Sequence, residues 1–233
     1  MSFRSELAKE LCGGRSEEYK DSTRKFANRG CFGCVYRCTK GEKTFAEKVV
    51  RCRPNGEEAE ILREFDVMCL VWSANKELFL EPLFLEIDRE QETAIIGMEW
   101  FDGETLGNTK EKDAFEEKLY MAAKELNSVD VSHRDLNHGN ILVSKDGNIK
   151  VIDFGSTTLL NEEKVVFVLS DYISGSEEEE QLEKEEAKLY QLFEFFRLFA
   201  TKDNIEKFLQ EGEKWAEILR FRDKTLLMRM LCE

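Results

Sequence analysis

The sequence predicts an α+β protein with two lobes. A five-stranded antiparallel sheet with one helix comes first, and a shortened, mainly helical lobe follows. Two observations support this prediction: short apolar runs separated by turn residues dominate the first hundred residues, and helical spacing of apolar residues dominates the second half. The 233 residues, 42% of them hydrophobic and 17 of them Phe, can supply a sizeable core. We therefore expect a single domain over residues 1–233.

Five strands and one helix are expected in the first lobe. The strands form a three-stranded meander and then a hairpin, over residues 23–50, 79–85 and 93–98. The helix is expected over residues 57–72, where the apolar residues at helical spacing are Ile61, Phe65 and Met68.

The second lobe is expected to begin with a helix over residues 108–126, with Asn108 as its N-cap. Asp146-Gly147 lies between two apolar runs and predicts a hairpin with a two-residue turn. After Ser174 the chain is expected to be helical, with a buried stripe formed by Leu189, Leu192, Phe193, Phe196 and Phe199.

The most informative stretch is His133-Arg134-Asp135-Leu136-Asn137-His138-Gly139-Asn140, which is followed by Asp153-Phe154-Gly155. Each polar side chain alone could cap a turn or end a strand. Together they suit transfer of a γ-phosphoryl group, which concentrates negative charge. Divalent cations held by oxygen ligands would neutralise that charge, while one carboxylate orients the attacking hydroxyl. Because Asn140 and Asp153 flank the predicted hairpin, its strands can bring both to one edge.

These residues resemble the catalytic loop and the metal-binding segment of protein kinases. The resemblance implies that Asp135 is the catalytic base, that Asn140 and Asp153 hold magnesium, and that ATP is the phosphoryl donor. His133 resembles the kinase residue that packs beneath Phe154, which is a structural role.

Residues 28–36 resemble the glycine-rich loop of kinases, with Asn28 at the position of its first glycine. Glycines let backbone amides approach phosphate oxygens without a Cβ in the way, although a tight hairpin would explain them equally well. The resemblance implies that nucleotide is contacted by Asn28, Gly30, Cys31, Phe32, Gly33, Cys34 and Val35.

Lys48 resembles the catalytic strand lysine that binds the α and β phosphates. Its carboxylate partner is expected on the helix over residues 57–72. We choose Glu64, and Glu60 is the alternative, because the two are four residues apart and share a helix face.

Residues 95–103 resemble the kinase gatekeeper and hinge, with Met98 as gatekeeper. The hinge over residues 99–103 would join an N-lobe of residues 1–98 to a C-lobe of residues 104–233. Backbone groups from Glu99 to Phe101 would face adenine. The side chains that would sandwich the base, and that could equally be core residues, are Val35, Ala46, Leu142 and Ile152.

Departures from common protein kinases narrow the resemblance. No Ala-Pro-Glu motif follows Asp153, and Asn137 stands where serine/threonine kinases usually carry lysine. The haspin family of atypical kinases is similar in three places: its catalytic loop resembles residues 133–143, its short segment after the metal site resembles residues 165–171, and a helix motif resembles Leu189-Tyr190-Gln191-Leu192. Haspins usually have Tyr and Thr where this chain has Phe154 and Gly155. The haspin resemblance implies a nuclear, chromosome-associated mitotic enzyme that phosphorylates a threonine near the start of a basic histone tail.

Charge favours a basic protein substrate. Lys and Arg total 34 against 48 Asp and Glu, a net charge of −14, so we expect no direct contact with nucleic acid. The acidic run over residues 177–186 could attract Arg and Lys of a substrate peptide, or could be a solvated helix face.

Apolar runs and cysteines limit the expected location of the protein and its metal chemistry. The sequence has no apolar run of about 18 residues and no apolar stretch of a signal peptide, so we expect an intracellular protein that does not enter membranes. The sequence does not set the oligomeric state, and a monomer is the expectation. Without the haspin resemblance the expected compartment is the cytoplasm. Seven cysteines read as reduced thiols, and the group formed by Cys31, Cys34 and Cys38 lacks the fourth ligand of a zinc site.

Two alternatives to a protein kinase remain. One is a small-molecule phosphotransferase of the same fold, which the near-complete glycine-rich loop disfavours. The other is a pseudokinase or ATPase acting as a binding module, which the intact set of Lys48, Asp135, Asn140 and Asp153 disfavours.

Overall fold

The computed structural model describes residues 5–30, 33–53, 56–110 and 112–159. The expected helices after Ser174, the acidic run over residues 177–186, and the haspin-like positions beyond residue 159 lie outside these residues. Two residues of the predicted nucleotide loop, Cys31 and Phe32, lie outside them as well.

Two compact units make up the chain, and their boundary differs from the lobe boundary drawn from the sequence. The first unit comprises Met1–Lys110 and Gly139–Thr157, so a hairpin from the second half of the sequence belongs with the N-terminal sheet. The described part of the second unit comprises residues 112–138 and 158–159.

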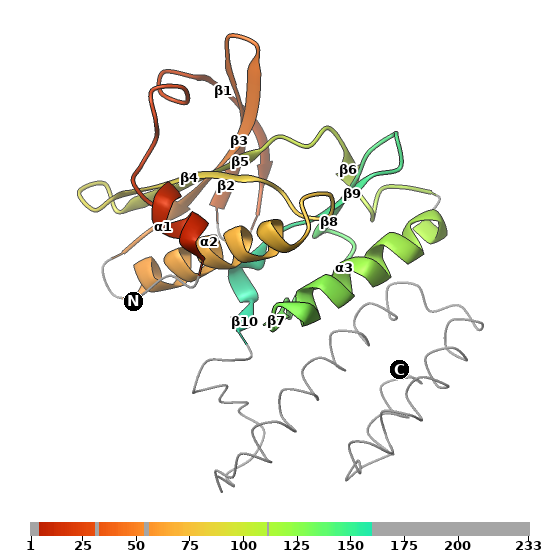
Figure 1. Ribbon diagram of the computed structural model, residues 1–233. Coiled ribbons are helices and arrows are strands. Elements are labelled where there is room, and N and C mark those ends of the chain that lie inside the picture. The colour runs from red at the N-terminus through yellow and green to blue at the C-terminus, as the bar shows by residue number, and fades with distance from the viewer. Residues whose placement is uncertain (1–4, 31–32, 54–55, 111, 160–233) are drawn as a thin grey trace, which may run out of the picture. The chain divides into compact units, whose positions relative to one another are not determined.

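A five-stranded antiparallel sheet forms the main layer of the first unit, in the order β1-β2-β3-β5-β4 (Figure 1). Its strands are β1 (Thr23–Arg29), β2 (Gly33–Lys40), β3 (Lys43–Arg51), β4 (Pro82–Asp88) and β5 (Thr93–Glu99). The predicted meander and hairpin are therefore confirmed. Strand β4 begins later than expected, because Phe79 leaves the sheet and makes an isolated parallel bridge to Val151.

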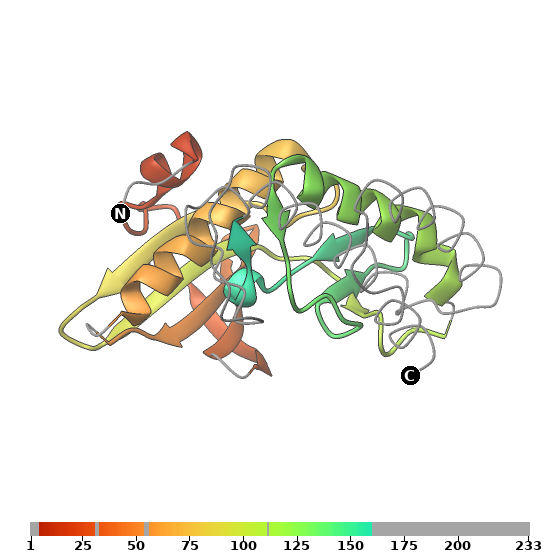
Figure 2. The same ribbon diagram turned by 90° about the horizontal axis from the view of Figure 1, so that it is seen from below.

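Helix α2 (Glu57–Ala74) lies along one face of the sheet, as both views of the ribbon show (Figures 1 and 2). Its buried side chains include the three that predicted it, Ile61, Phe65 and Met68. We call this side of the sheet the α2 face, and the opposite side the outer face.

The outer face is defined by residues that stand opposite one another on adjacent strands and therefore point the same way. Across strands β2, β3, β5 and β4, these residues are Tyr36, Glu47, Gly97 and Phe84. Phe84 belongs to a buried aromatic cluster with Phe45 and Cys38. Tyr19, from the segment before β1, packs against the rings of Phe45 and Phe84, with centroid distances of 5.1 and 5.2 Å.

One helix was missing from the prediction for this unit. The short helix α1 (Glu6–Leu11) is capped by Ser5, whose hydroxyl accepts a hydrogen bond from the amide of Ala8. Six residues are too few for apolar periodicity to reveal a helix. Helix α1 packs beside α2 and β4 (Figure 2).

The first unit also contains the hairpin β8 (Ile141–Val143) and β9 (Ile149–Val151), beside the short strand β6 (Glu104–Thr105). The hairpin was predicted, but its two-residue turn was wrong. The amide of Ser144 donates to the carbonyl of Asn148, which makes the connection longer, and Gly147 adopts φ +78° within it. The 3₁₀ turn η2 (Phe154–Ser156) follows this hairpin.

The second unit contains the 3₁₀ turn η1 (Lys112–Phe115), helix α3 (Glu116–Ser128), and the antiparallel pair of β7 (Val131–Ser132) and β10 (Thr158–Leu159). The predicted start of this helix at Asn108 was wrong. Leu106 is fully buried next to β6, and the amide of Asn108 donates to the carbonyl of Thr105 in a turn. Asn108 therefore lies in a turn, and α3 begins only at Glu116, after η1.

Among the described helices, none combines the length and the apolar character that crossing a bilayer requires. The cysteines in the described residues, Cys12, Cys34, Cys38, Cys52 and Cys69, are thiols.

Packing on the outer face predicts the effect of one added methyl group. A Cβ on Gly97 would lie less than 3.0 Å from the ring of Phe84. Gly97→Ala should therefore lower the free energy of unfolding by about 1–3 kcal/mol, as overpacking of a core does. The measurement is urea unfolding followed by fluorescence.

Gly13→Ala is the matched control, because no atom lies within 4 Å of its added Cβ. It should change the free energy of unfolding by less than about 0.5 kcal/mol or raise it slightly. Equal losses in the two variants would contradict the packing argument.

Candidate active site

The centre of the first unit is a buried ion-pair triad on the α2 face. Lys48, on β3, donates from Nζ to Oε1 of Glu64 at 2.7 Å and to Oδ1 of Asp153 at 2.8 Å. The side chains of Lys48 and Glu64 are 12% and 8% exposed, so both charges are largely removed from water. Residues 105 positions apart in the sequence thus meet at one ammonium group.

Electrostatics keep this ammonium charged. Burial by itself lowers the pKa of Lys48, but the carboxylates of Glu64 and Asp153 outweigh burial and raise that pKa above its ordinary value. Burial raises the pKa of Glu64, and the ammonium of Lys48 offsets part of this effect. Each charge therefore depends on the other for its ionised form.

Lys48 contacts Glu64 and not Glu60, the alternative that the sequence left open. Glu60 is exposed to solvent, whereas Glu64 is buried on the side of α2 that faces the sheet. Helical spacing alone could not separate the two residues, because they share a helix face and differ by one turn in their position along α2.

Asn140 and Asp153 lie at the open end of the β8–β9 hairpin, as the sequence suggested. The amide of Ile152 donates to the carbonyl of Asn140 at 2.9 Å and closes this end. Asp153 has φ 67° and ψ 76°, a left-handed conformation that non-glycine residues rarely adopt outside turns. Phe154 is buried next to Phe79, with ring centroids 6.1 Å apart, and so holds this conformation in place.

The donor set at this end suits magnesium delivered with a nucleotide. Among the described residues, no group of three or more His, Cys, Asp and Glu side chains gathers into a self-contained metal centre. Magnesium commonly binds one or two protein oxygens together with phosphate oxygens and water. Asp153 and Asn140 supply ligands of that kind, so the residues present fit the ion.

The predicted catalytic loop lies in the second unit. His133 is fully buried, and its Nδ1 accepts a hydrogen bond from the amide of Asp135 at 3.4 Å. Arg134, between them, has φ 64°. The buried imidazole therefore has a structural role, as the sequence suggested, in shaping the turn that presents the exposed Asp135.

Asn137 has a role that sequence reasoning missed. Its side-chain amide donates to Oδ1 of Asp135 at 2.9 Å and to the carbonyl of the same residue at 3.2 Å. Sequence reasoning treated Asn137 only as a missing lysine, although an Asn two residues after an Asp can hydrogen-bond back to it.

The predicted glycine-rich loop joins β1 to β2, which pair as antiparallel neighbours. The amide of Gly30 donates to the carbonyl of Gly33 at 2.9 Å, and a Cβ on Gly33 would collide with the backbone of Val49. The packing of β2 on β3 therefore requires glycine at position 33. The sequence left open this structural reason beside a role in binding phosphate. Oδ1 of Asn28 accepts from the amide of Arg29 at 2.8 Å.

The predicted adenine-facing residues of the sheet share the α2 face with Lys48. Val35 stands opposite Lys48, and Ala46 stands opposite Met98, the predicted gatekeeper. Cys34, which precedes Val35, points to the outer face. Leu142 and Ile152 lie on and after the β8–β9 hairpin of the same unit.

At the hinge, the amide of Glu99 donates to the carbonyl of Glu81 at 2.8 Å. This amide is therefore used in a hydrogen bond within the protein and does not face adenine. The carbonyl of Glu99 and the backbone of Phe101 are the hinge groups that could recognise the base.

Lys150 is a second residue that the sequence analysis missed. Its buried Nζ donates to the carbonyls of Lys76 and Phe79, both at 2.8 Å, and lies 3.1 Å from Oε2 of Glu99. Lys150 thereby ties the strand before Asp153 to the loop after α2 and to the hinge. A lone lysine within the apolar run of residues 149–152 was the signal that could have revealed it.

Comparison with known proteins agrees with this arrangement. Residues 26–177, more than half of the chain, match the family model described as protein kinase domain. The chain is 31% identical over 144 residues to a mitogen-activated protein kinase kinase, MKK2, of Pyricularia oryzae, covering 54% of this chain and 26% of that protein. It is 29% identical over 152 residues to serine/threonine-protein kinase 36 of Mus musculus, covering 59% of this chain and 11% of that protein.

A further relative is the probable serine/threonine-protein kinase mkcC of Dictyostelium discoideum, 35% identical over 83 residues, which cover 32% of this chain and 9% of that protein. The chain thus spans about a quarter or less of the length of these relatives. The family match covers the glycine-rich loop, the Lys48 triad and the catalytic loop, and on this basis the chain belongs to the protein kinase domain family.

Proposed function

We propose that the protein transfers the γ-phosphoryl group of ATP to a serine or threonine hydroxyl of another protein. The observation that carries this proposal is the Lys48–Glu64–Asp153 triad, in which one buried ammonium is held by two carboxylates. A buried, charged lysine on a sheet face suits the binding of phosphate oxygens. The names of the relatives, which include serine/threonine kinases, support the class of acceptor.

Each residue has a defined task in this proposal. Lys48 binds the α and β phosphates, and Glu64 holds its ammonium in place. Asp153 and Asn140 hold magnesium, which neutralises charge that develops on the transferred phosphoryl group. Asp135 accepts the proton of the attacking hydroxyl, and Asn137 orients the carboxylate that does so.

The substrate that we propose is a basic protein segment, and specifically a threonine of a core histone tail. The net charge of −14 supports a basic partner, because opposite charge steers association. The resemblance of residues 133–143 to haspins supports the histone tail. A nuclear location and action as a monomer without direct nucleic-acid contact belong to the same proposal.

Phosphate transfer tested side by side on different acceptors examines this function. Radiolabelled ATP is offered with a core histone tail peptide, with casein, and with an aminoglycoside or choline. Label on the histone peptide above casein supports the full proposal, and label on both proteins supports a protein kinase of broader choice. Label on the small molecules alone indicates a small-molecule phosphotransferase, and bound ATP without transfer indicates a binding module.

Asp135→Asn should separate chemistry from binding. The substitution removes the proton acceptor but keeps the size of the side chain, so kcat should fall by about 10²–10⁴-fold while ATP affinity stays nearly unchanged. Steady-state kinetics and nucleotide titration measure the two effects. Asp146→Asn, at an exposed turn, is the matched control. Turnover that survives in Asp135→Asn would show that another group takes the proton.

Asp153→Ala should act on binding instead. The substitution removes a magnesium ligand and one partner of Lys48, so it should weaken the affinity for ATP in the presence of magnesium. The ATP affinities measured with and without magnesium should then become nearly equal. Asp135→Asn serves as the control here, since it is expected to bind normally. If magnesium-dependent affinity were intact in Asp153→Ala, its assignment as a metal ligand would be wrong.

Glu64→Gln should raise KM for ATP by roughly 10- to 100-fold, the equivalent of one charge-assisted hydrogen bond. The reason is that Lys48 then keeps a single carboxylate partner, Asp153. Glu60→Gln, at an exposed residue one turn earlier on α2, is the matched control and should leave KM unchanged. The reverse pattern would assign the lysine partner to Glu60.

A further inference from the structure

A segment that precedes the matched kinase region packs on both faces of the sheet. We call residues 5–22 the N-terminal segment. It begins at helix α1, beside α2, where the amide of Ser5 donates to Oδ1 of the buried Asp66 at 2.9 Å. Ala8, in the middle of α1, is fully buried. One end of the segment is therefore fixed to α2.

The segment then passes the edge of the sheet. The amide of Gly14 donates to the carbonyl of Leu85 at 3.1 Å, on the edge strand β4. Beyond this point the segment lies on the outer face, where Tyr19 packs on Phe45 and Phe84. The N-terminal segment thus runs from α2, around β4, to the opposite side of the sheet.

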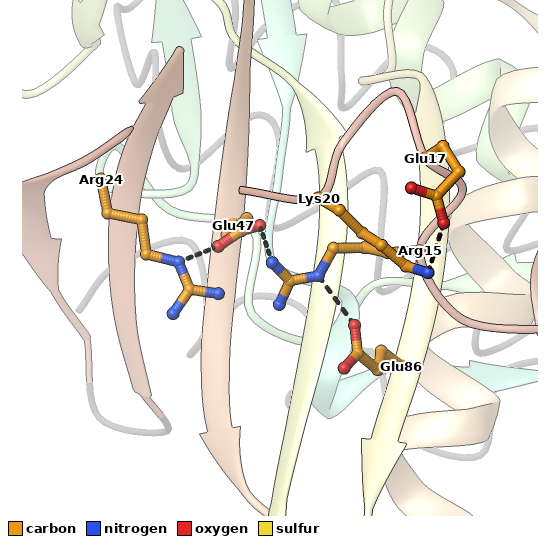
Figure 3. A network of polar contacts seen from close by, with 6 residues as sticks. All are labelled: Arg15, Glu17, Lys20, Arg24, Glu47 and Glu86. Carbon is orange, nitrogen blue, oxygen red and sulfur yellow. Dashed lines mark hydrogen bonds and ion pairs between the residues drawn. The ribbon is translucent and has the colours of Figure 1, made fainter. Parts of the chain in front are cut away.

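On the outer face the segment makes a buried ion-pair cluster, which we call the Glu47 cluster. Arg15 Nη1 lies 3.1 Å from Glu47 Oε1, and Arg24 Nε lies 2.5 Å from Glu47 Oε2. Arg15 Nε also donates to Glu86 at 2.7 Å. Figure 3 shows Arg15 between the two carboxylates and Arg24 reaching Glu47 from the other side.

Glu47 has no exposed surface, whereas the side chains of Arg15 and Arg24 are 14% and 38% exposed. The two guanidinium groups approach as ion pairs and not as well-aligned hydrogen bonds, so Coulomb attraction carries the contact. A buried carboxylate is unfavourable without such partners, so Glu47 holds Arg15 strongly in place.

Ser5 and Arg15 of the N-terminal segment contact residues close to the Lys48–Glu64 pair in the sequence. Glu47 precedes Lys48 on β3, and Asp66 follows Glu64 by two residues on α2. The distance between Lys48 and Glu64 depends on how α2 sits against β3. The N-terminal segment is fixed to α2 through Ser5 and to β3 through Arg15, so it constrains the distance between α2 and β3 directly.

We propose that the N-terminal segment positions α2 for catalysis through the Glu47 cluster, so that Arg15 and Glu47 are positioning residues for the Lys48–Glu64 pair. The inference rests on the proposed function, because it assigns to this pair the task of binding ATP phosphates. Neither arginine of the cluster lies within the residues that match the kinase family, which begin at residue 26.

The test is Arg15→Ala, measured by hydrogen–deuterium exchange of the α2 amides and by the KM and kcat for ATP. Loss of the contact should speed exchange over residues 61–74. It should also raise KM by roughly 2- to 30-fold, the range over which a positioning residue acts on a distant site. Glu86→Gln, which removes only one partner of Arg15, should shift both readouts in the same direction by less.

Lys20→Ala is the matched control. Lys20 belongs to the same segment, but its ion pair with Glu17 is exposed and does not reach the sheet (Figure 3). It should change neither readout. If Arg15→Ala lowered only the melting temperature and left both α2 exchange and KM at their wild-type values, the role would be structural and the inference would be wrong.

A double-mutant cycle tests whether Arg15 acts through Glu47. If it does, Arg15→Ala combined with Glu47→Gln should raise KM by less than the product of the two single effects. The exchange measurement needs no ATP, so the inference can be judged separately from the proposed function. A wild-type protein that binds no ATP would refute the function, whereas unchanged α2 exchange in Arg15→Ala would refute the positioning role.

Discussion

The ammonium of Lys48 is the group on which the arrangement of the first unit depends. Its two carboxylate partners come from a helix and from the end of a hairpin, so the contact forms only when α2, β3 and the β8–β9 hairpin are all in register. Burial makes the charges of Lys48 and Glu64 unfavourable alone, so each needs its partner to stay ionised in this position. Many weaker features of the unit, such as the left-handed Asp153 and the buried Phe154, are best understood as supports for this contact.

Two other buried charges repeat this principle at different places. Lys150 joins β9 to the loop after α2 and to the hinge, and Glu47 joins β3 to the segment before β1. Buried ion pairs contribute little to net stability compared with well-packed apolar residues, but a missing partner is costly. We interpret the three sites as specifying geometry: each allows one arrangement of its elements and penalises the alternatives.

Much of the fold could be predicted from the sequence, because the long elements carry repeated signals. The strands and α2 each contain several apolar residues at a regular spacing, and the Asp-Gly pair marked the hairpin. The start of α3 was misplaced because Asn108 has the right chemistry for a cap but is held in a turn by the buried Leu106. For the site, motif spacing identified Lys48, Asn140 and Asp153. Glu64 and Lys150 were harder, since their partners depend on contacts between distant segments. The local hydrogen bond from Asn137 to Asp135 was missed because Asn137 was compared only with a lysine.

The N-terminal segment has a practical consequence for producing the protein. The region recognisable as a kinase begins at residue 26, so a recombinant fragment trimmed to that boundary would lack Ser5, Arg15 and Arg24. Such a fragment would leave the carboxylate of Glu47 buried without its cations and the rings of Phe45 and Phe84 uncovered by Tyr19. A fragment meant to keep these contacts therefore has to include residues 5–25, and low solubility of a shorter fragment would reflect the missing N-terminal segment.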